Sequence, residues 1–224
     1  MIGIAIDGPS GAGKSTIAKA LAKEFGYIYV DTGAIYRTVG LYMQKNGIST
    51  EDKEGIENNL SNVKVEIKYV DGEQKMFLNG EDVSGYIRTP LIAKYASVVS
   101  AVPKVRAFLF DMQRSLAREN NVIMDGRDIG TVILPDADVK IFLTASAEAR
   151  ARRRVDQLAE KGEIVGFDEI LASIKERDER DSGRDVAPLR AADDAVTLDS
   201  SDLTLEESIA AAKSIVLEKL SNKR

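Results

Sequence analysis

The sequence contains neither cysteine nor histidine among its 224 residues. Without cysteine, the chain can form no disulfide, no thiolate nucleophile and no cysteine-ligated zinc site. Without histidine, it can hold neither a serine–histidine–aspartate triad nor an imidazole base. Any catalysis must therefore come from carboxylates, amines, hydroxyls, backbone amides or a bound metal ion.

Long apolar runs are also missing, and none reaches the roughly 20 residues of a transmembrane helix. The apolar start of the chain meets a charge at Asp7 and has no basic flank, so it does not resemble a signal peptide. We therefore expect a cytoplasmic protein that does not contact membranes. No exposed apolar helix face stands out in the sequence, so we expect a monomer.

The chain has no excess of positive charge, since its net charge is −5. A nucleic-acid-binding protein usually carries the opposite sign. Positive charge is instead concentrated late in the sequence, in eight arginines: Arg150, Arg152, Arg153, Arg154, Arg177, Arg180, Arg184 and Arg190. Such a local concentration favours a small anionic ligand over nucleic acid.

The order of apolar segments predicts an α/β fold with a parallel sheet. Strands are expected at residues 2–6, 27–30, 122–124, 139–143 and 195–198. Helices are expected at residues 15–25, 34–44, 103–120, 147–161, 167–181 and 204–220. Alternating polarity and the turn signals Asp71-Gly72 and Asn79-Gly80 predict a small antiparallel insertion at residues 60–86. We expect a single domain over residues 1–224.

A complete phosphate-binding loop lies between the first predicted strand and helix, where residues 8–15 fit the pattern G-x-x-x-x-G-K-[ST]. Its glycines let backbone amides converge on a phosphate, and the helix N-terminus adds about half a positive charge. Lys14 can reach the β- and γ-phosphates, Ser15 can bind Mg²⁺, and Thr16 can support the α-phosphate. A glycine-rich turn that binds nothing is the weaker alternative. We assign nucleotide binding to Gly8, Pro9, Ser10, Gly11, Ala12, Gly13, Lys14, Ser15 and Thr16.

Other features narrow the class of protein. The Asn-Lys-x-Asp motif of guanine-binding GTPases is not found, and motor ATPases and helicases are usually larger. The arginine-dense late segment instead fits a small-molecule kinase with a lid, which we place at about residues 150–166. When the lid closes, we expect one or more of its arginines to reach the ATP phosphates, and we include Arg153 in the ATP site. The candidates are Arg150, Arg152, Arg153 and Arg154. A solvated helix face is the alternative for this segment.

Four longer segments together resemble the bacterial cytidylate kinases, at residues 7–15, 31–37, 125–132 and 175–181. Shorter matches lie at residues 80–84, 87–89 and 186–189, so the resemblance covers essentially the whole chain. It implies a nucleoside monophosphate kinase fold: a five-stranded parallel sheet flanked by helices, a β insertion in the monophosphate-binding region, and a mobile helical lid. It also implies phosphoryl transfer from ATP to CMP or dCMP, with Mg²⁺.

The resemblance assigns the acceptor site residue by residue. It implies that the CMP phosphate is held by Arg37, Arg127 and Arg184, the cytosine by Arg106 and Asp128, and the ribose by Ser97, Arg177 and Asp181, with Thr32 and Gly33 completing the site. Thr32 stands where some members have serine, and it keeps the hydroxyl. Lys14, Arg127 and Arg184 form the implied catalytic set. On spacing alone, these arginines and acids would instead be surface residues or structural ion pairs.

Three points stay open at this stage. Asp125 ends a predicted strand and could hold Mg²⁺ through water, beside the metal ligand Ser15. The acceptor could be UMP, AMP or a metabolite such as shikimate. The protein could also be a nucleotide-binding regulator without turnover, although the intact Lys14 and Ser15 argue against this.

Overall fold

The protein, described here by a computed structural model over residues 1–222, is built on a sheet of five parallel strands. Their order is β2-β6-β1-β7-β8, so the first strand lies in the middle. The strands are β1 (Gly3–Asp7), β2 (Ile28–Asp31), β6 (Val122–Gly126), β7 (Val139–Thr144) and β8 (Val196–Asp199). All five strands predicted from the sequence are confirmed.

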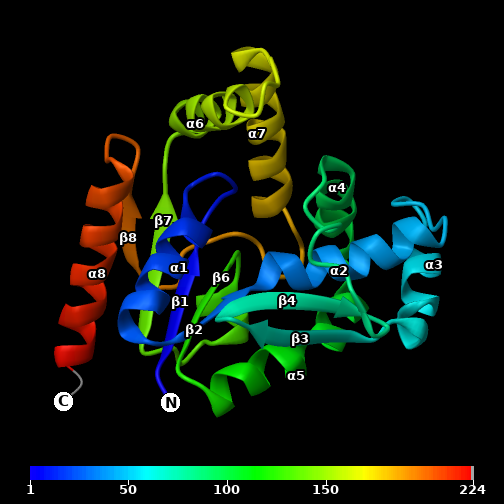
Figure 1. Cartoon of the computed structure of the whole chain (residues 1–224), viewed down its shortest axis with the longest axis horizontal. Coiled ribbons are helices and arrows are strands. Elements are labelled where there is room, and N and C mark those ends of the chain that lie inside the picture. The colour runs from blue at the N-terminus through cyan, green and yellow to red at the C-terminus, as the bar shows by residue number, and fades with distance from the viewer. Residues whose placement is uncertain (223–224) are drawn as a thin grey trace.

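Both faces of the main sheet are covered by helices (Figure 1). Ile4 and Ile6 of β1 join a core cluster with helices α1 (Lys14–Phe25) and α8 (Leu205–Ser221). Ala5, between them, joins the opposite cluster with α2 (Thr32–Lys45) and α5 (Pro103–Glu119). Because successive residues of a strand face opposite sides, a sheet covered on both faces needs this near-continuous apolar run.

A second, antiparallel sheet lies within residues 60–86, as the alternating pattern predicts. Its strands are β3 (Val65–Val70), β4 (Glu73–Leu78) and the short β5 (Glu81–Asp82). They are joined by turns at Asp71 and Asn79, which both have positive φ. The short helices α3 (Lys53–Asn58) and η1 (Leu60–Asn62) precede this sheet and were not predicted.

Helix α4 (Pro90–Val99) packs alongside α2 and was also not predicted (Figure 1). Its start carries a readable signal, because the Thr89 side chain accepts a hydrogen bond from the Ile92 amide and Pro90 occupies the first turn. The apolar, partly β-branched sequence that follows is compatible with a strand as well as a helix.

The remaining elements lie at and beyond the carboxyl edge of the main sheet. After β6, the chain forms a π-helical turn, η2 (Ile129–Ile133). Helices α6 (Ala147–Ala159) and α7 (Phe167–Ser182) project past the edge, and α7 returns toward it (Figure 1). Over residues 1–222, no helix has both the length and the apolar character required to cross a bilayer.

Candidate active site

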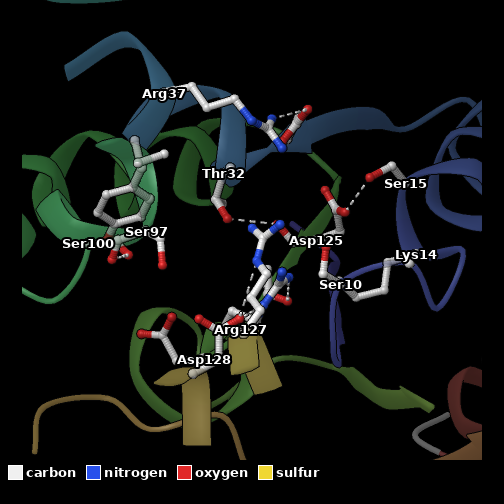
Figure 2. Close-up of a pocket in the computed structure, with 18 of the residues that line it drawn as sticks. Ser10, Lys14, Ser15, Thr32, Arg37, Ser97, Ser100, Asp125, Arg127 and Asp128 are labelled. Carbon is white, nitrogen blue, oxygen red and sulfur yellow. Dashed lines mark hydrogen bonds and ion pairs between the residues drawn. The ribbon is translucent and has the colours of Figure 1, made fainter. Parts of the chain in front are cut away.

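A cavity of about 270 Å³ opens at the carboxyl edge of the main sheet, where ligands bind in open α/β folds. Its phosphate-loop side is lined by Ser10, Gly11, Gly13, Lys14, Ser15 and Thr16. Its other side is lined by all ten residues predicted for the acceptor: Thr32, Gly33, Arg37, Ser97, Arg106, Arg127, Asp128, Arg177, Asp181 and Arg184. The structure thus brings both predicted sets to one cavity (Figure 2).

Other predicted residues lie outside the lining: Gly8, Pro9, Ala12 and Arg153. Gly8 shapes the loop instead, since its φ of +147° is unfavourable for other residues and a Cβ there would lie 1.9 Å from the carbonyl oxygen of Leu143. Ala12 is buried beneath the loop. The carbonyl of Pro9 accepts a 2.7 Å hydrogen bond from Lys14 Nζ.

Lys14 is buried at the loop side of the cavity, where a phosphate would meet it. Burial lowers the pKa of Lys14, and the nearby guanidinium of Arg127 lowers it further. A polyphosphate beside Lys14 would oppose both effects and favour the charged amine. Lys14 Nζ therefore donates to the Pro9 carbonyl, and an oxygen of a bound phosphate would take the place of that carbonyl as acceptor.

Ser15 and Asp125 meet across the start of α1 and the end of β6. Ser15 Oγ donates to Asp125 Oδ2 at 2.8 Å, and Tyr29 Oη donates to Asp125 Oδ1 at 2.9 Å. Burial raises the pKa of Asp125, and the negative charge of Asp31 adds to the effect. A hydroxyl and a carboxylate at this distance are the hard oxygen donors that suit Mg²⁺. Among the described residues, no group of three or more acidic side chains is placed to hold a metal ion by itself.

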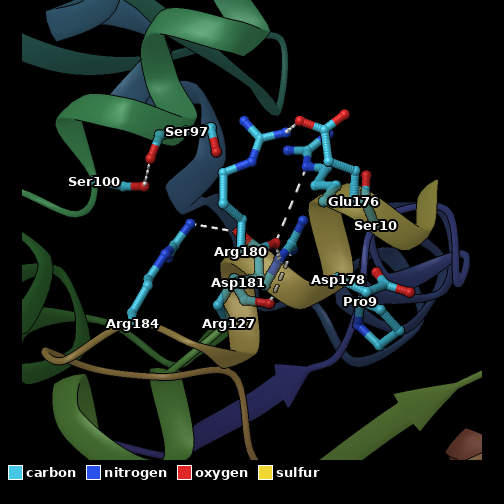
Figure 3. Close-up of polar contacts among 12 residues, drawn as sticks. Pro9, Ser10, Ser97, Ser100, Arg127, Glu176, Asp178, Arg180, Asp181 and Arg184 are labelled. Atoms are coloured by element: carbon cyan, nitrogen blue, oxygen red, sulfur yellow. Dashed lines mark hydrogen bonds and ion pairs between the residues drawn. The ribbon is translucent and has the colours of Figure 1, made fainter. Parts of the chain in front are cut away.

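Asp181, on α7, anchors a cluster of guanidinium groups on the acceptor side (Figure 3). Arg127 Nε donates to its Oδ2 at 2.9 Å, Arg184 pairs with its Oδ1, and Arg177 Nε lies 4.0 Å away. Burial raises the pKa of Asp181, but Arg127 and Arg184 outweigh it and hold the pKa below its ordinary value. One carboxylate thus pairs closely with two guanidinium groups at the cavity wall and has a third 4.0 Å away.

Arg106 and Asp128 form a buried ion pair at the far end of the cavity. Arg106 Nη1 also donates to the Ser100 carbonyl at 3.1 Å, and its guanidinium lies 5.7 Å from the centre of the Tyr36 ring. Burial raises the pKa of Asp128, against the opposing charge of Arg106. A buried fork of donors beside an acceptor can recognise one edge of a planar base.

Arg37 and Thr32 extend from the first turns of α2. Arg37 Nη1 lies 3.8 Å from Asp31 Oδ2, and within residues 1–222 this buried nitrogen has no hydrogen-bond partner. Figure 2 marks this Arg37 ion pair with a dashed line. Thr32 Oγ1 donates to the carbonyl of Asp125 at 2.7 Å, so its proton is already used in fixing α2 to β6.

Two of the lid arginines, Arg150 and Arg153 of α6, make different contacts. Arg153 points to the residue that follows β8, where its guanidinium donates to Ser200. Arg150, one turn earlier, is the α6 residue that meets the phosphate loop, since its Nη1 donates to the Ser10 carbonyl at 3.1 Å. The same guanidinium pairs with both carboxylate oxygens of Asp178 on α7.

Sequence reasoning did not assign several lining residues: Asp31, Tyr36, Ala96, Ser100, Gly126 and Gln157. Asp31 and Tyr36 lie within residues 31–37, a segment that the resemblance already singled out. Gln157 lies on an exposed, charged helix, and its sequence surroundings carry no signal of a site.

A phosphate loop at one end of a cavity and clustered guanidinium groups at the other define a phosphotransferase of the P-loop class. The family model described as cytidylate kinase matches residues 4–218. The chain is 54% identical to the cytidylate kinase of Caldicellulosiruptor bescii, over 92% of this chain and 91% of that protein. It is 48% identical to that of Carboxydothermus hydrogenoformans, over 95% and 96%. The chain belongs to the cytidylate kinase family.

A solved structure agrees at the level of the fold alone. An uncharacterized protein from Eubacterium ventriosum is similar with a TM-score of 0.50 and 13% identity, and the match covers 99% of each chain. At such low identity the comparison says nothing about the substrate.

Proposed function

We propose that the protein transfers the γ-phosphoryl group of ATP to CMP or dCMP, which yields ADP and CDP or dCDP. The observation that carries the proposal is the single cavity that joins a complete phosphate loop to the Arg106–Asp128 pair and the arginine cluster. Membership of the cytidylate kinase family supports the choice of acceptor.

At the donor end, the loop amides and Lys14 bind the β- and γ-phosphates of ATP. Ser15 and Asp125, whose oxygens lie 2.8 Å apart, would hold Mg²⁺ together with the phosphates. When bound, Mg²⁺ neutralises charge on the phosphate oxygens. Lys14 adds a positive charge at the position where negative charge spreads over the transferring group.

At the acceptor end, the nucleophile is an oxygen of the CMP phosphate, which is largely dianionic at pH 7. It needs no general base, which agrees with a chain that contains no histidine. The difficulty is to bring two polyanions together. Arg37, Arg127 and Arg184 supply guanidinium forks that bind phosphate oxygens in pairs and keep their charge.

The base and sugar are bound further along the cavity. Arg106 donates to O2 and N3 of cytosine, and Asp128 accepts from the exocyclic N4 amine, a donor that uracil lacks. Asp181, with Arg177 and Ser97, contacts the ribose. A carboxylate has about four lone-pair sites, so Asp181 can accept from a sugar hydroxyl while it holds two arginines.

We further propose that helix α6 and the segment that follows it close over ATP, with Arg153 or its neighbour Arg150 reaching the phosphates. The 160–166 segment between α6 and α7 is largely exposed, and Ile164 is fully so. Limited proteolysis tests this closure. Cleavage in residues 150–166 should slow when ATP·Mg²⁺ and CMP are both present, and equal cleavage with and without them would contradict it.

The deciding experiment is a coupled ADP-release assay with ATP·Mg²⁺ and, separately, CMP, dCMP, UMP and AMP. Turnover of CMP and dCMP well above UMP and AMP supports the proposal. Turnover of another monophosphate would keep the phosphoryl-transfer chemistry and remove the cytosine assignment. ATP binding without turnover of any acceptor would favour a regulator. That the protein acts as a cytoplasmic monomer stays a prediction, and size-exclusion chromatography with light scattering tests its oligomeric part.

A further inference from the structure

Arg88 lies in the segment Ile87-Arg88-Thr89, which the proposed function leaves without a role. It follows the antiparallel sheet and immediately precedes α4. Its Nη2 donates to Asp31 Oδ2 at 3.1 Å. The Arg88 side chain is 58% exposed while the Asp31 side chain is 9% exposed, so the arginine covers the carboxylate from the solvent side.

Asp31, at the end of β2, is held by hydrogen bonds to both its side chain and its backbone. Its Oδ1 accepts from the Ala34 amide at 2.8 Å and so caps helix α2. Its backbone N–H donates to Gln74 Oε1 at 2.8 Å, and its carbonyl accepts from Gln74 Nε2 at 3.2 Å. Gln74 belongs to β4, so the antiparallel sheet holds the backbone of Asp31 while Arg88 holds its side chain.

The second carboxylate oxygen of Asp31 lies between two guanidinium groups. Arg88 is hydrogen-bonded to Oδ2, whereas Arg37 Nη1 stays 3.8 Å from the same oxygen. Arg37 Nη1 is buried and, among the described residues, unpartnered. An unsatisfied buried donor of this kind favours an acceptor that arrives with the ligand.

Without Arg88, Asp31 would be a partly uncompensated carboxylate at the cavity wall. It would draw in Arg37, its remaining cationic neighbour, and would repel an incoming phosphate dianion. The geometry therefore makes Arg88 a competitor of Arg37 for one oxygen.

We infer that Arg88 is a positioning residue of the acceptor site. Its hydrogen bond to Asp31 Oδ2 keeps Arg37 in a longer, 3.8 Å ion pair with that oxygen, so that Arg37 Nη1 stays available to the acceptor's phosphate. The inference rests on the proposed function, since it concerns how the same site takes a nucleoside monophosphate. It also assigns a role to the antiparallel insertion, because Gln74 in the insertion and Arg88 just after it together set the position of Asp31. Arg88 itself does not touch the substrate.

The test compares Arg88→Ala with Lys45→Ala by steady-state kinetics, with CMP and ATP varied in turn. Lys45 is the matched control, because its 3.3 Å ion pair with Glu81 also joins α2 to the insertion but does not involve Asp31. In Arg88→Ala the KM for CMP should rise about tenfold, the loss expected for one hydrogen bond to a charged group. The KM for ATP should change less than about twofold, and Lys45→Ala should leave both values unchanged.

A double-substitution cycle separates this role from a merely structural one. Asp31→Asn removes the charge and keeps an oxygen that can cap α2. In the Asp31→Asn background, Arg88→Ala should have no further effect on the KM for CMP, since no carboxylate is left to capture Arg37. An unchanged KM for CMP in Arg88→Ala overturns the inference. So does an equal loss in both backgrounds, or an equal loss in Lys45→Ala.

Failure of the proposed function gives a different result. If the proposed function is wrong, the unaltered protein itself turns over a monophosphate other than CMP, or turns over no monophosphate. The Arg88 comparison then uses the monophosphate that is turned over, because the inference concerns its phosphate and not its base. With no turnover, calorimetric titration of the unaltered protein, Arg88→Ala and Lys45→Ala with CMP replaces kinetics. Equal or absent binding in all three overturns the inference.

Discussion

The donor and acceptor ends of the cavity are built in opposite ways. The donor end comes almost entirely from nine consecutive residues, 8–16, and it relies on backbone amides and one buried amine. The acceptor end takes side chains from α2, α4, α5, the segment after β6, and α7 with the residues that follow it. In the proposed function, one short segment of the chain therefore binds the phosphates of ATP. Arginines from distant parts of the sequence bind the monophosphate.

The two ends also differ in how their charged side chains are paired. Lys14 is directed to a backbone carbonyl, and its pKa is lowered by burial. The acceptor arginines are instead paired with carboxylates, as in the Asp181 cluster and the Arg106–Asp128 pair. A ligand at the acceptor end must therefore share or break the ion pairs between these arginines and their carboxylates. A ligand at the donor end replaces only a neutral group, the Pro9 carbonyl, as the partner of Lys14.

The largest effect is expected from a substitution at the donor end. Lys14→Ala should lower kcat by roughly a thousandfold, the size seen when one group that stabilises transition-state charge is removed. CMP binding measured by calorimetry should persist, because Lys14 is not part of the acceptor set. Lys19→Ala, an exposed position on the same helix, is the matched control. A near-normal kcat for Lys14→Ala would remove the phosphate-loop assignment.

A smaller effect is expected at the base-reading end. Asp128→Asn places amide protons where the carboxylate accepts, so the preference for CMP over UMP should fall by about tenfold to a hundredfold. The KM for ATP should stay unchanged if the two ends are independent. The measurement is kcat/KM for CMP and for UMP in Asp128→Asn. It is compared with the same two values in Asp136→Asn, a control at an exposed position. An intact preference in Asp128→Asn would place cytosine reading elsewhere.

The sugar contact should respond more modestly. Asp181→Asn should reduce the kcat/KM for CMP about tenfold relative to dCMP, because only CMP offers a 2′-hydroxyl to the lost charged acceptor. Both substrates should also lose some activity, since Arg127 and Arg184 lose their common anchor. If the ratio of the two substrates does not change, Asp181 serves only to hold those arginines.

The smallest effect concerns Asp7, which links the two ends. Its carboxylate ends β1 and accepts from the Ile129 and Gly130 amides at 2.8 and 2.7 Å, just after Arg127 and Asp128. Burial raises the pKa of Asp7 to about 7, against the opposing effect of those amides, and the charges of Asp128 and Lys14 act in opposite directions.

The folded protein thus holds this proton up to about pH 7, while an unfolded aspartate releases it near 3.8. The free energy of unfolding should therefore fall as pH rises through that window. The Tm of Asp7→Asn, taken relative to the unaltered protein, should rise between pH 4 and pH 7 and then level off. A shift of several degrees is expected, at about 2–4 °C for each kcal/mol. Calorimetry across this range checks it, and a flat difference would contradict the raised pKa.

The contrast between the ends also explains what could be predicted from the sequence. The phosphate loop is local, so a pattern of eight residues locates it, and the buried strands are visible as short apolar runs. The acceptor residues are separated by up to 152 positions, from Thr32 to Arg184. Spacing alone could not bring them together, and only the family resemblance did.

Features that depend on long-range contacts were missed for physical reasons. The π-helical turn η2 is held by Asp7, more than 120 residues earlier in the sequence, so no local pattern reveals it. The choice between Arg150 and Arg153 likewise depends on how α6 packs. A helix rotates by about 100° per residue, so arginines three positions apart need tertiary context to show which one faces the loop.

The Gln74 contact has a consequence for the solubility of the folded chain. Among residues 1–222, strand β2 pairs with β6 alone, so it is an edge strand of the main sheet. Gln74 satisfies the outward N–H and C=O of Asp31, and Tyr69 Oη donates to the outward carbonyl of Tyr29 at 3.0 Å. Two side chains of the hairpin thus imitate a neighbouring strand. They close a backbone edge that would otherwise be open to pairing with another chain, and so guard the sheet against edge-to-edge aggregation.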